Sequence, residues 1–207
     1  DSGLDFAVRL DQRAVVEATW NINRWEWTLP YEVTDTSTLE FVLGEDCYED
    51  ARGVNVDFYN TGLTFWSEDE LADPDVTNTC KLTVGTKYTS KYKPTQPFLK
   101  DQNGRVMGLD RFTLGKVHLN FESIGETAVT VTDKKTARTW SYSNNGRVMG
   151  SSSNRVGFAK LEAGTFSFPV RLESDRVEIL IETDNYLPFI LRDMEWGGMF
   201  NKRGKRF

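Results

Sequence analysis

The sequence predicts an all-β protein whose antiparallel strands form a β-sandwich or barrel-like arrangement, with almost no helix. Apolar and polar residues alternate with a period of two in many short segments, as half-buried strands require. Turn residues such as Asn103-Gly104 and Asn144-Asn145-Gly146 separate these segments. Apart from a single helical turn expected at 68–71, before Pro74, no segment shows the apolar stripe of an amphipathic helix. Short strands broken by frequent turns are typical of sandwiches and barrels.

The expected strands follow one another along the whole chain. In the first half, the alternation in Trp25-Glu26-Trp27 indicates the first strand. Aromatic and β-branched residues favour the strands expected after it. The second half has the cleanest alternation, in Val117-His118-Leu119-Asn120-Phe121. In chain order, we expect strands at 25–29, 39–43, 54–58, 80–84, 117–121, 129–131, 136–142, 165–170 and 177–181. Turns are also expected at Gly85-Thr86 and Ala163-Gly164.

The charge is uneven along the chain, which suggests two subdomains. Residues 1–99 hold 8 Lys and Arg against 18 Asp and Glu, whereas residues 100–207 hold 17 against 13. We expect an acidic β-rich subdomain at 1–99 and a β-sandwich-like subdomain with a basic tail at 100–207, although one continuous domain is an alternative. An acidic first half argues against a general nucleic-acid-binding protein, which needs a basic face. It is compatible with a wall past which DNA slides, because like charges repel.

Neither a membrane segment nor a disulfide framework is expected. No apolar run approaches the roughly 20 residues that span a bilayer, and the start Asp1-Ser2-Gly3 is typical of an excised fragment or a processed product. The two cysteines, Cys47 and Cys80, favour free thiols in a protein assembled inside a cell, and whether they pair stays open.

No catalytic, cofactor or metal site is predicted. His118 is the only histidine, and its place between Val117 and Leu119 turns it to the face opposite theirs. The segment Ser151-Ser152-Ser153 lacks the sequence of a nucleophile elbow. Calcium binding at 68–75 is conceivable, but the EF-hand spacing is missing. Carboxylates are frequent, and no pattern selects the acid pair of a polysaccharide-digesting enzyme, which is the least favoured alternative.

Four tryptophans of the first half allow two interpretations. They are Trp20, Trp25, Trp27 and Trp66. A sugar-stacking platform on Trp25 and Trp27 would make the chain a carbohydrate-binding β-sandwich module. Core and interface positions are favoured instead, because each large ring brings considerable buried area.

An ordered series of motifs resembles the C-terminal, platform-like part of the nozzle (tail tubular B) proteins of short-tailed bacteriophages. The first half contributes looser matches at 27–31 and 84–88. The second half matches more closely, at 97–101, 115–119, 146–151, 164–170, 177–179, 184–188 and 195–198, and in the basic close from Arg203 to Arg206. Two departures from the family pattern are the Gly197-Gly198 pair, where an acidic residue is expected after Trp196, and Tyr186 in place of a small polar residue.

The resemblance implies a mechanical role in the phage tail. Under the carbohydrate-binding alternative, the chain would instead be a module of a phage tail fibre or tailspike. Nozzle proteins form a sixfold ring below the adaptor ring of a short tail, and their channel lets the genome leave the capsid. We therefore expect a homo-hexamer in the virion tail, assembled in the host cytoplasm, that contacts the adaptor protein and tail fibres and lets DNA pass without specific binding. Charge alone favours a solvated C-terminus, but the resemblance implies a subunit or adaptor interface made by Trp196, Lys202, Arg203, Lys205 and Arg206.

Overall fold

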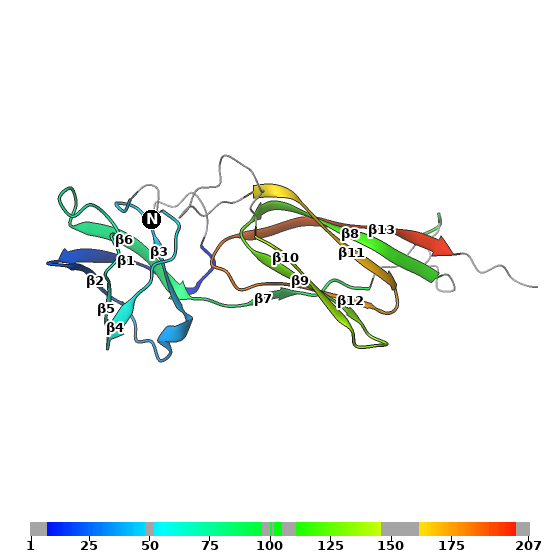
Figure 1. Cartoon of the computed structure of the whole chain (residues 1–207), viewed down its shortest axis with the longest axis horizontal. Coiled ribbons are helices and arrows are strands. Elements are labelled where there is room, and N and C mark those ends of the chain that lie inside the picture. The colour runs from blue at the N-terminus through cyan, green and yellow to red at the C-terminus, as the bar shows by residue number, and fades with distance from the viewer. Residues whose placement is uncertain are drawn as a thin grey trace, which may run out of the picture. The chain divides into compact units, whose positions relative to one another are not determined.

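The computed structural model describes residues 8–48, 52–96, 100, 102–104, 111–145 and 162–201. Within them the strands are all antiparallel and the only helical element is one 3-10 turn, η1 (Thr36–Thr38), which confirms the predicted all-β class. The chain divides into two compact units, whose strands are labelled in Figure 1. Unit 1 comprises Asp1–Thr89, Arg147–Leu161 and Asp184–Pro188, and unit 2 comprises Ser90–Gly146, Glu162–Thr183 and Phe189–Phe207. The predicted division at residue 99, between an acidic subdomain and a subdomain with a basic tail, stays a prediction.

Unit 1 is built on one six-stranded sheet with the strand order β3-β6-β1-β2-β5-β4. Its strands are β1 (Asp11–Asn21), β2 (Arg24–Thr28), β3 (Leu39–Leu43), β4 (Tyr59–Thr61), β5 (Thr64–Ser67) and β6 (Thr79–Thr86). One face carries the core of the unit, because alternate residues of the strands turn to it. Phe41 lies at the centre, with its ring centroid 5.1 Å from Trp27, 4.7 Å from Phe58 and 5.4 Å from Phe65.

The strand predicted at 54–58 is a loop that covers the outer edge of β3. The amide of Leu43 donates to the carbonyl of Val54 at 3.0 Å, and the amide of Val56 donates to the carbonyl of Phe41 at 2.8 Å. The side chain of Asn55 takes the place of a neighbouring strand, since its Oδ1 accepts from the amide of Phe41 at 3.1 Å. The segment forms only an isolated bridge, Val42 to Asn55, because a side chain supplies part of the pairing.

Tyr186 anchors the connection between two strands of unit 2 within unit 1. Its amide oxygen accepts from the amide of Arg9 at 2.8 Å, and its hydroxyl donates to the carbonyl of Gly53 at 2.9 Å. The ring packs against Val8, Leu10 and Val42. Burial, with a further contribution from nearby Glu40, raises the pKa of Tyr186 to about 12. This departure from the family pattern therefore has a structural role.

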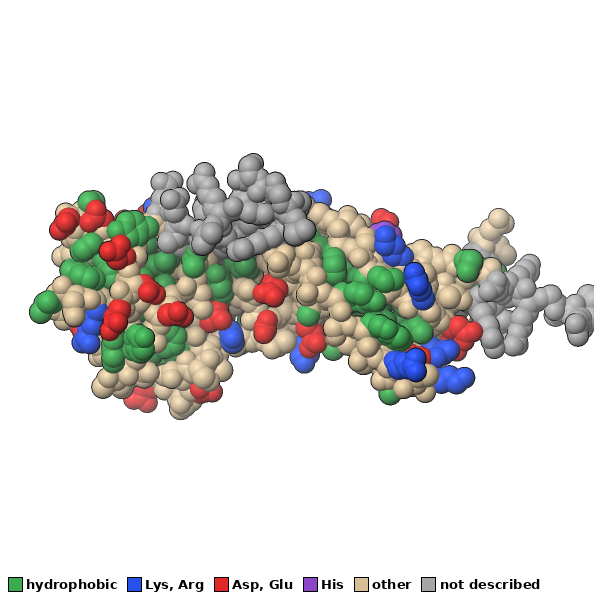
Figure 2. All heavy atoms as spheres, in the orientation of Figure 1, with side chains coloured by type: hydrophobic (Ala, Val, Ile, Leu, Met, Phe, Trp, Pro, Cys, Tyr) green, Lys and Arg blue, Asp and Glu red, His purple; other side chains and the backbone are tan. Residues whose placement is uncertain are grey.

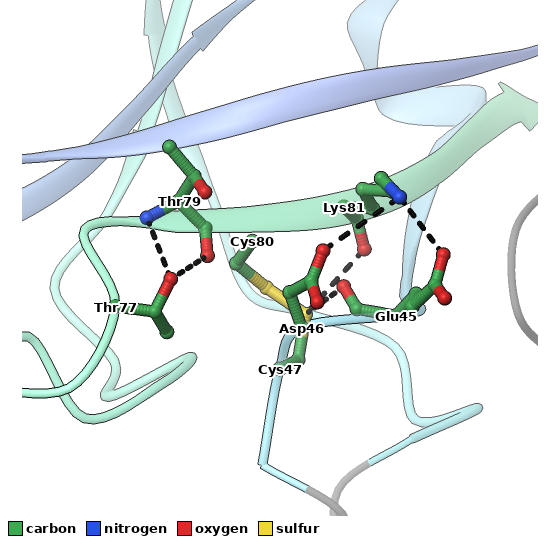
Figure 3. Close-up of a disulfide and its surroundings, with 7 residues drawn as sticks. All are labelled: Glu45, Asp46, Cys47, Thr77, Thr79, Cys80 and Lys81. Atoms are coloured by element: carbon green, nitrogen blue, oxygen red, sulfur yellow. Dashed lines mark hydrogen bonds and ion pairs between the residues drawn. A yellow bond between two sulfur atoms is a disulfide. The ribbon is translucent and has the colours of Figure 1, made fainter.

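Cys47 and Cys80 form a disulfide, so the expectation of two free thiols is wrong (Figure 3). The chain leaves β3 and returns along β6, where the amide of Gly44 donates to the carbonyl of Lys81 at 2.8 Å and the amide of Lys81 to that of Glu45 at 2.9 Å. The Lys81 ammonium also lies 2.8 Å from a carboxylate oxygen of Glu45. These contacts bring the two cysteine Cα atoms to 5.1 Å, although 33 residues separate them in sequence.

Three further local predictions are corrected. No helical turn forms at 68–71, and the turn there lies at 74–76 instead. Gly85-Thr86 lies inside β6, where the glycine serves close packing: a Cβ at this position would lie 2.6 Å from Leu10 Cβ and 2.7 Å from the carbonyl oxygen of Asp11. Ala163-Gly164 lies inside a strand of unit 2 rather than in a turn.

Unit 2 is a sandwich of a four-stranded and a three-stranded sheet. The orders are β10-β9-β12-β7 and β11-β8-β13. The strands are β7 (Ser90–Tyr92), β8 (Arg111–Ile124), β9 (Thr127–Asp133), β10 (Thr139–Asn144), β11 (Glu162–Glu173), β12 (Val177–Thr183) and β13 (Phe189–Asn201). A single core joins the two sheets, with Val117 and Leu119 on one side and Val129, Val131 and Ile179 on the other. The alternation in the sequence thus predicts this core correctly.

A buried carboxylate organises the turns at one end of the four-stranded sheet. Asp133 is 3% exposed and accepts from the Arg176 guanidinium, from the Thr136 hydroxyl at 2.7 Å and from the Lys135 amide at 2.9 Å. The hydrogen bond from Arg176 is the main reason that the pKa of Asp133 lies far below its ordinary value. The side chain therefore joins the β9–β10 turn to the β11–β12 turn.

We predict that the stability of unit 2 falls in acid because Asp133 becomes protonated. A carboxyl whose pKa is lower in the folded state stabilises the fold above its unfolded pKa of about 3.9, and this contribution is lost as the pH falls toward the folded pKa. Unfolding curves between about pH 7 and pH 2 should show the loss. Asp133→Asn should be less stable at neutral pH and should show a shallower decline in acid, and parallel pH profiles of the two proteins would contradict the assignment.

Candidate assembly surfaces

His118 lies on the outward face of the three-stranded sheet, as its place in the sequence predicts. Its Nδ1 lies 2.6 Å from the hydroxyl of Ser167, and Glu195 occupies the matching register position on β13. A nucleophilic site also needs oxyanion donors and a hollow for substrate. Neither of the two hollows described below includes any of these three residues.

A second row of cross-strand side chains indicates that the row of Ser167, His118 and Glu195 is a structural feature of the sheet. On the same face, the Thr165 hydroxyl donates to Asn120 Oδ1 and the Asn120 amide donates to Asp193, each at 2.6 Å. Polar pairs across neighbouring strands are an ordinary source of sheet stability. We therefore interpret both rows as cross-strand hydrogen bonding that fixes β11, β8 and β13 side by side.

The described residues offer no site for a metal ion. They contain no group of three or more His, Cys, Asp or Glu side chains placed to hold a metal ion, including at 68–75. No helix in the described part of the chain is long and apolar enough to cross a membrane. Burial raises the pKa of Glu40, but the Lys87 ammonium lies 3.6 Å from it and neither hollow includes it.

The sugar platform considered for Trp25 and Trp27 is wrong, and the core interpretation is confirmed. Trp25 is fully buried and Trp27 is 3% exposed, because both turn to the core face of β2. Trp66 turns to the other face, where its ring lies between the Arg24 guanidinium, 4.8 Å from its centroid, and the ring of Tyr59, 6.1 Å away. This ladder ties the short edge strand β4 to β5 and β2.

One flank of the unit 2 sandwich contains an open hollow, and we name this side the β10 flank. It consists of β10 and the neighbouring part of β11, which enclose an open hollow of about 300 Å³ lined by Trp140, Tyr142, Pro169, Val170, Arg171 and Leu172. Tyr142 closes the inner end, since its ring stacks on Phe168 at 5.5 Å and its hydroxyl donates to the Pro169 carbonyl at 3.0 Å. Trp140 also faces inward, opposite Val131, yet remains 39% exposed.

The opposite flank carries exposed apolar side chains, and we name it the β13 flank. Trp196 closes the sandwich here together with Met194 and residues 94–96, around a cavity of only about 10 Å³. Trp196 is nevertheless 37% exposed, and Met199 farther along β13 is 70% exposed. The structure thus places Trp196, one predicted interface residue, at a surface with further apolar residues. Lys202, Arg203, Lys205 and Arg206 lie outside the described residues.

The two glycines that depart from the family pattern have different surroundings. A Cβ on Gly198 would lie 2.2 Å from the carbonyl oxygen of Thr113 and 2.9 Å from the ring of Phe112, whereas a Cβ on Gly197 would meet nothing within 4 Å. Position 197 therefore has room for the acidic residue that the family pattern favours. Position 198 needs glycine because β8 approaches it closely.

We predict opposite outcomes for alanine at these neighbouring positions. Gly198→Ala should lower the free energy of unfolding by about 1–3 kcal/mol, because the strands must separate locally to admit the methyl group. Gly197→Ala should change it by less than about 0.5 kcal/mol and serves as the matched control. Urea unfolding of the two variants measures the difference, and equal stability would show that β8 and β13 are not in the observed register.

The two flanks differ in charge. Lys134, Lys135 and Arg138 are exposed in the turn that leads into β10, and Arg171 lines the hollow. Figure 2 shows Lys and Arg side chains gathered over this end of β9 and β10, next to a hydrophobic patch. The β13 flank exposes Asp193 and Glu195, together with Arg192, whose guanidinium lies 3.4 Å from the Glu122 carboxylate.

The interface role that the sequence assigns to Trp196 stays a prediction, and no pattern in the sequence indicates the hollow or the exposure of Trp140. Trp140 was expected to lie in a strand, but no signal separated it from a core residue, because its exposure depends on how far the opposite sheet reaches. Met199 follows two glycines, and this interrupts the alternation that would have indicated a strand.

Comparison with known proteins gives one result for the whole chain. The family model described as bacteriophage nozzle protein matches residues 1–207. No curated protein matches the sequence.

Proposed function

The chain belongs to the bacteriophage nozzle protein family, and on this premise we propose that it forms part of the hexameric tail nozzle through which a short-tailed phage ejects its DNA. Membership places the protein in the virion tail as a structural component. The proposal adds a ring of six copies that docks below the adaptor ring and also contacts tail fibres. The observation that carries it is the match to the family model over every residue of the chain.

The two flanks of unit 2 support a ring of identical copies. A cyclic ring with heterologous contacts buries a different patch on each side of every subunit. Unit 2 has two such patches: a hollow beside a basic turn, and a strand with exposed apolar residues and two carboxylates. Trp196 belongs to the second patch, and we propose that Lys202, Arg203, Lys205 and Arg206 extend this interface toward the adaptor.

The acidic first half supports a channel that does not retain DNA. Residues 1–99 carry ten more acidic than basic side chains. Figure 2 shows Asp and Glu side chains spread over the visible face of unit 1. We propose that this half faces the passing genome, because like charges prevent the phosphates from adhering.

Imaging the whole protein by electron microscopy tests the proposal. Rings with sixfold symmetry in purified protein or in virion tails are the expected result. Serine at positions 202, 203, 205 and 206 should then weaken docking of the ring to the adaptor. Trimers, or a monomer at every concentration, would contradict the nozzle role. No observation favours the carbohydrate-binding alternative, whose two tryptophans are buried.

A further inference from the structure

Most free sheet edges of the described residues are protected against pairing with another chain. The edge of β3 is covered by residues 53–56, and β4 and β7 have only three residues each. β11 contains Pro169, and a register shift beside Arg171, whose φ is 55°, interrupts its edge. Short strands, proline and bulges are the ordinary means by which proteins keep a sheet edge from pairing.

β10 is an edge strand twice as long as β4 or β7, and its pairing with β9 contains no register shift. Its six residues, Thr-Trp-Ser-Tyr-Ser-Asn, include no charge and no proline, and only β9 pairs with it among the described strands. The hollow lies directly beside it, lined in part by the inward-facing but exposed Trp140. A strand that added to β10 would also cover this hollow.

β13 is a long edge strand whose last part is equally unprotected. It spans 13 residues without lysine or proline, and β8 is its only partner among the described strands. Register shifts interrupt its first half and recur between Gly197 and Gly198, so the stretch from 198 to 201 forms a separate short edge. This stretch carries Met199, which is 70% exposed, and Phe200, which is 36% exposed.

The two unprotected strands lie on opposite flanks of one rigid sandwich. β10 packs beside β11, as the Tyr142–Phe168 stack shows, whereas β13 closes the other flank through Trp196 and residues 94–96. β10 and β13 of the same copy therefore cannot meet. Two different edges on opposite sides, each with no second partner among the described strands, are what a head-to-tail contact between identical copies needs.

We propose that β13 of one copy docks on the β10 flank of the next copy, with the Met199 or Phe200 side chain in the hollow beside Trp140. This inference rests on the proposed ring and names its contact surface. The occupant is a second copy because shape and charge both match. The hollow of about 300 Å³ has room for such a side chain, since one water takes about 30 Å³.

The charges near the two strands favour the same pairing. Arg171 in the lining of the hollow, and Lys134 and Lys135 in the turn before β10, would face Asp193 and Glu195 of the incoming strand. A contact of β13 with another β13 would instead bring these carboxylates together, and like charges placed opposite each other weaken strand pairing. The charge pattern therefore selects the heterologous contact over a twofold one.

Photo-cross-linking in the assembled whole protein tests the contact. A benzoylphenylalanine at position 199 should cross-link to residues 139–144 or 169–172 of another copy, and a mixture of isotopically labelled and unlabelled protein shows that the link joins two copies. Cross-links to β13 of another copy, to another protein, or to no residue within intact rings would overturn the inference and leave the ring standing. Absence of rings would overturn both proposals.

A charge substitution gives an independent measurement. Met199→Lys should raise the protein concentration at which half of the chains assemble by about tenfold or more, because it places an ammonium group in a hollow that Arg171 lines. Val76→Lys is the matched control, since Val76 is 81% exposed and belongs to unit 1, which contributes no residue to either flank. Both monomers should keep the circular dichroism of the unmodified chain. Equal assembly of the two folded variants would overturn the proposed contact.

Discussion

Trp25→Ala is expected to lower the free energy of unfolding of unit 1 by about 3–5 kcal/mol, the usual cost of removing a large aromatic side chain from a packed core. Trp25 is fully buried, and its ring centroid lies 5.5 Å from that of Trp20. Alanine would leave a cavity beneath β2, whose neighbours β1 and β5 hold it in register and limit how far the core can collapse. The effect approaches the whole stability of an ordinary small domain.

Tyr59→Ala is the control for this variant. Tyr59 is 58% exposed and lies at the outer end of the ladder with Trp66, so its removal should cost less than about 1 kcal/mol. Urea unfolding followed by tryptophan fluorescence measures both, since Trp20, Trp25, Trp27 and Trp66 belong to unit 1. Unchanged stability in Trp25→Ala, with loss of binding to a glycan, would return the sugar platform to consideration.

The strands that the sequence predicts best are those with one face in a core and the other in solvent. Val117 and Leu119 are buried while His118 between them is not, and this contrast is what alternation records. β12 is predicted for the same reason. The segment 54–58 has a similar alternation but becomes a loop, because Asn55 can pair with β3 through its side chain.

Features that depend on contacts distant in sequence could not be predicted. Alternation is weak at the Gly197-Gly198 pair in β13, where the close approach of β8 decides which residue fits. The exposure of Trp140 depends on the reach of the opposite sheet. The same limit applies to Tyr186, whose partners Arg9 and Gly53 are more than 130 residues away in the chain. The candidate surfaces are thus properties of sheet order and register.

Reduction of the Cys47–Cys80 disulfide is expected to lower the free energy of unfolding of unit 1 by about 3–4 kcal/mol, mainly because the unfolded chain gains freedom when a loop of this length opens. The closed loop contains β4, β5 and the residues that cover β3. Loss of the disulfide therefore affects both edges of the sheet as well as the segment 44–47. Urea unfolding with and without reductant measures the difference.

A variant with alanine at both cysteines provides the control, because its stability should not respond to reductant. Alkylation after unfolding without reductant should label neither sulfur, because a disulfide has no thiol to react and unfolding exposes both positions, which are buried in the folded chain. Labelling of both sulfurs under these conditions would contradict the disulfide.

We also predict that the redox state of Cys47 and Cys80 differs between protein inside a host cell and protein in released virions. Thiols stay reduced in most cytosols and oxidise outside them, so chains taken from the cytoplasm should carry two thiols and chains in released tails should carry none. The backbone contacts of Gly44 and Glu45 with Lys81 do not involve sulfur, so they can hold the two cysteines close before the bond forms. Unit 1 should therefore fold in the reduced state with lower stability and gain the difference after release, which unfolding of both pools measures directly.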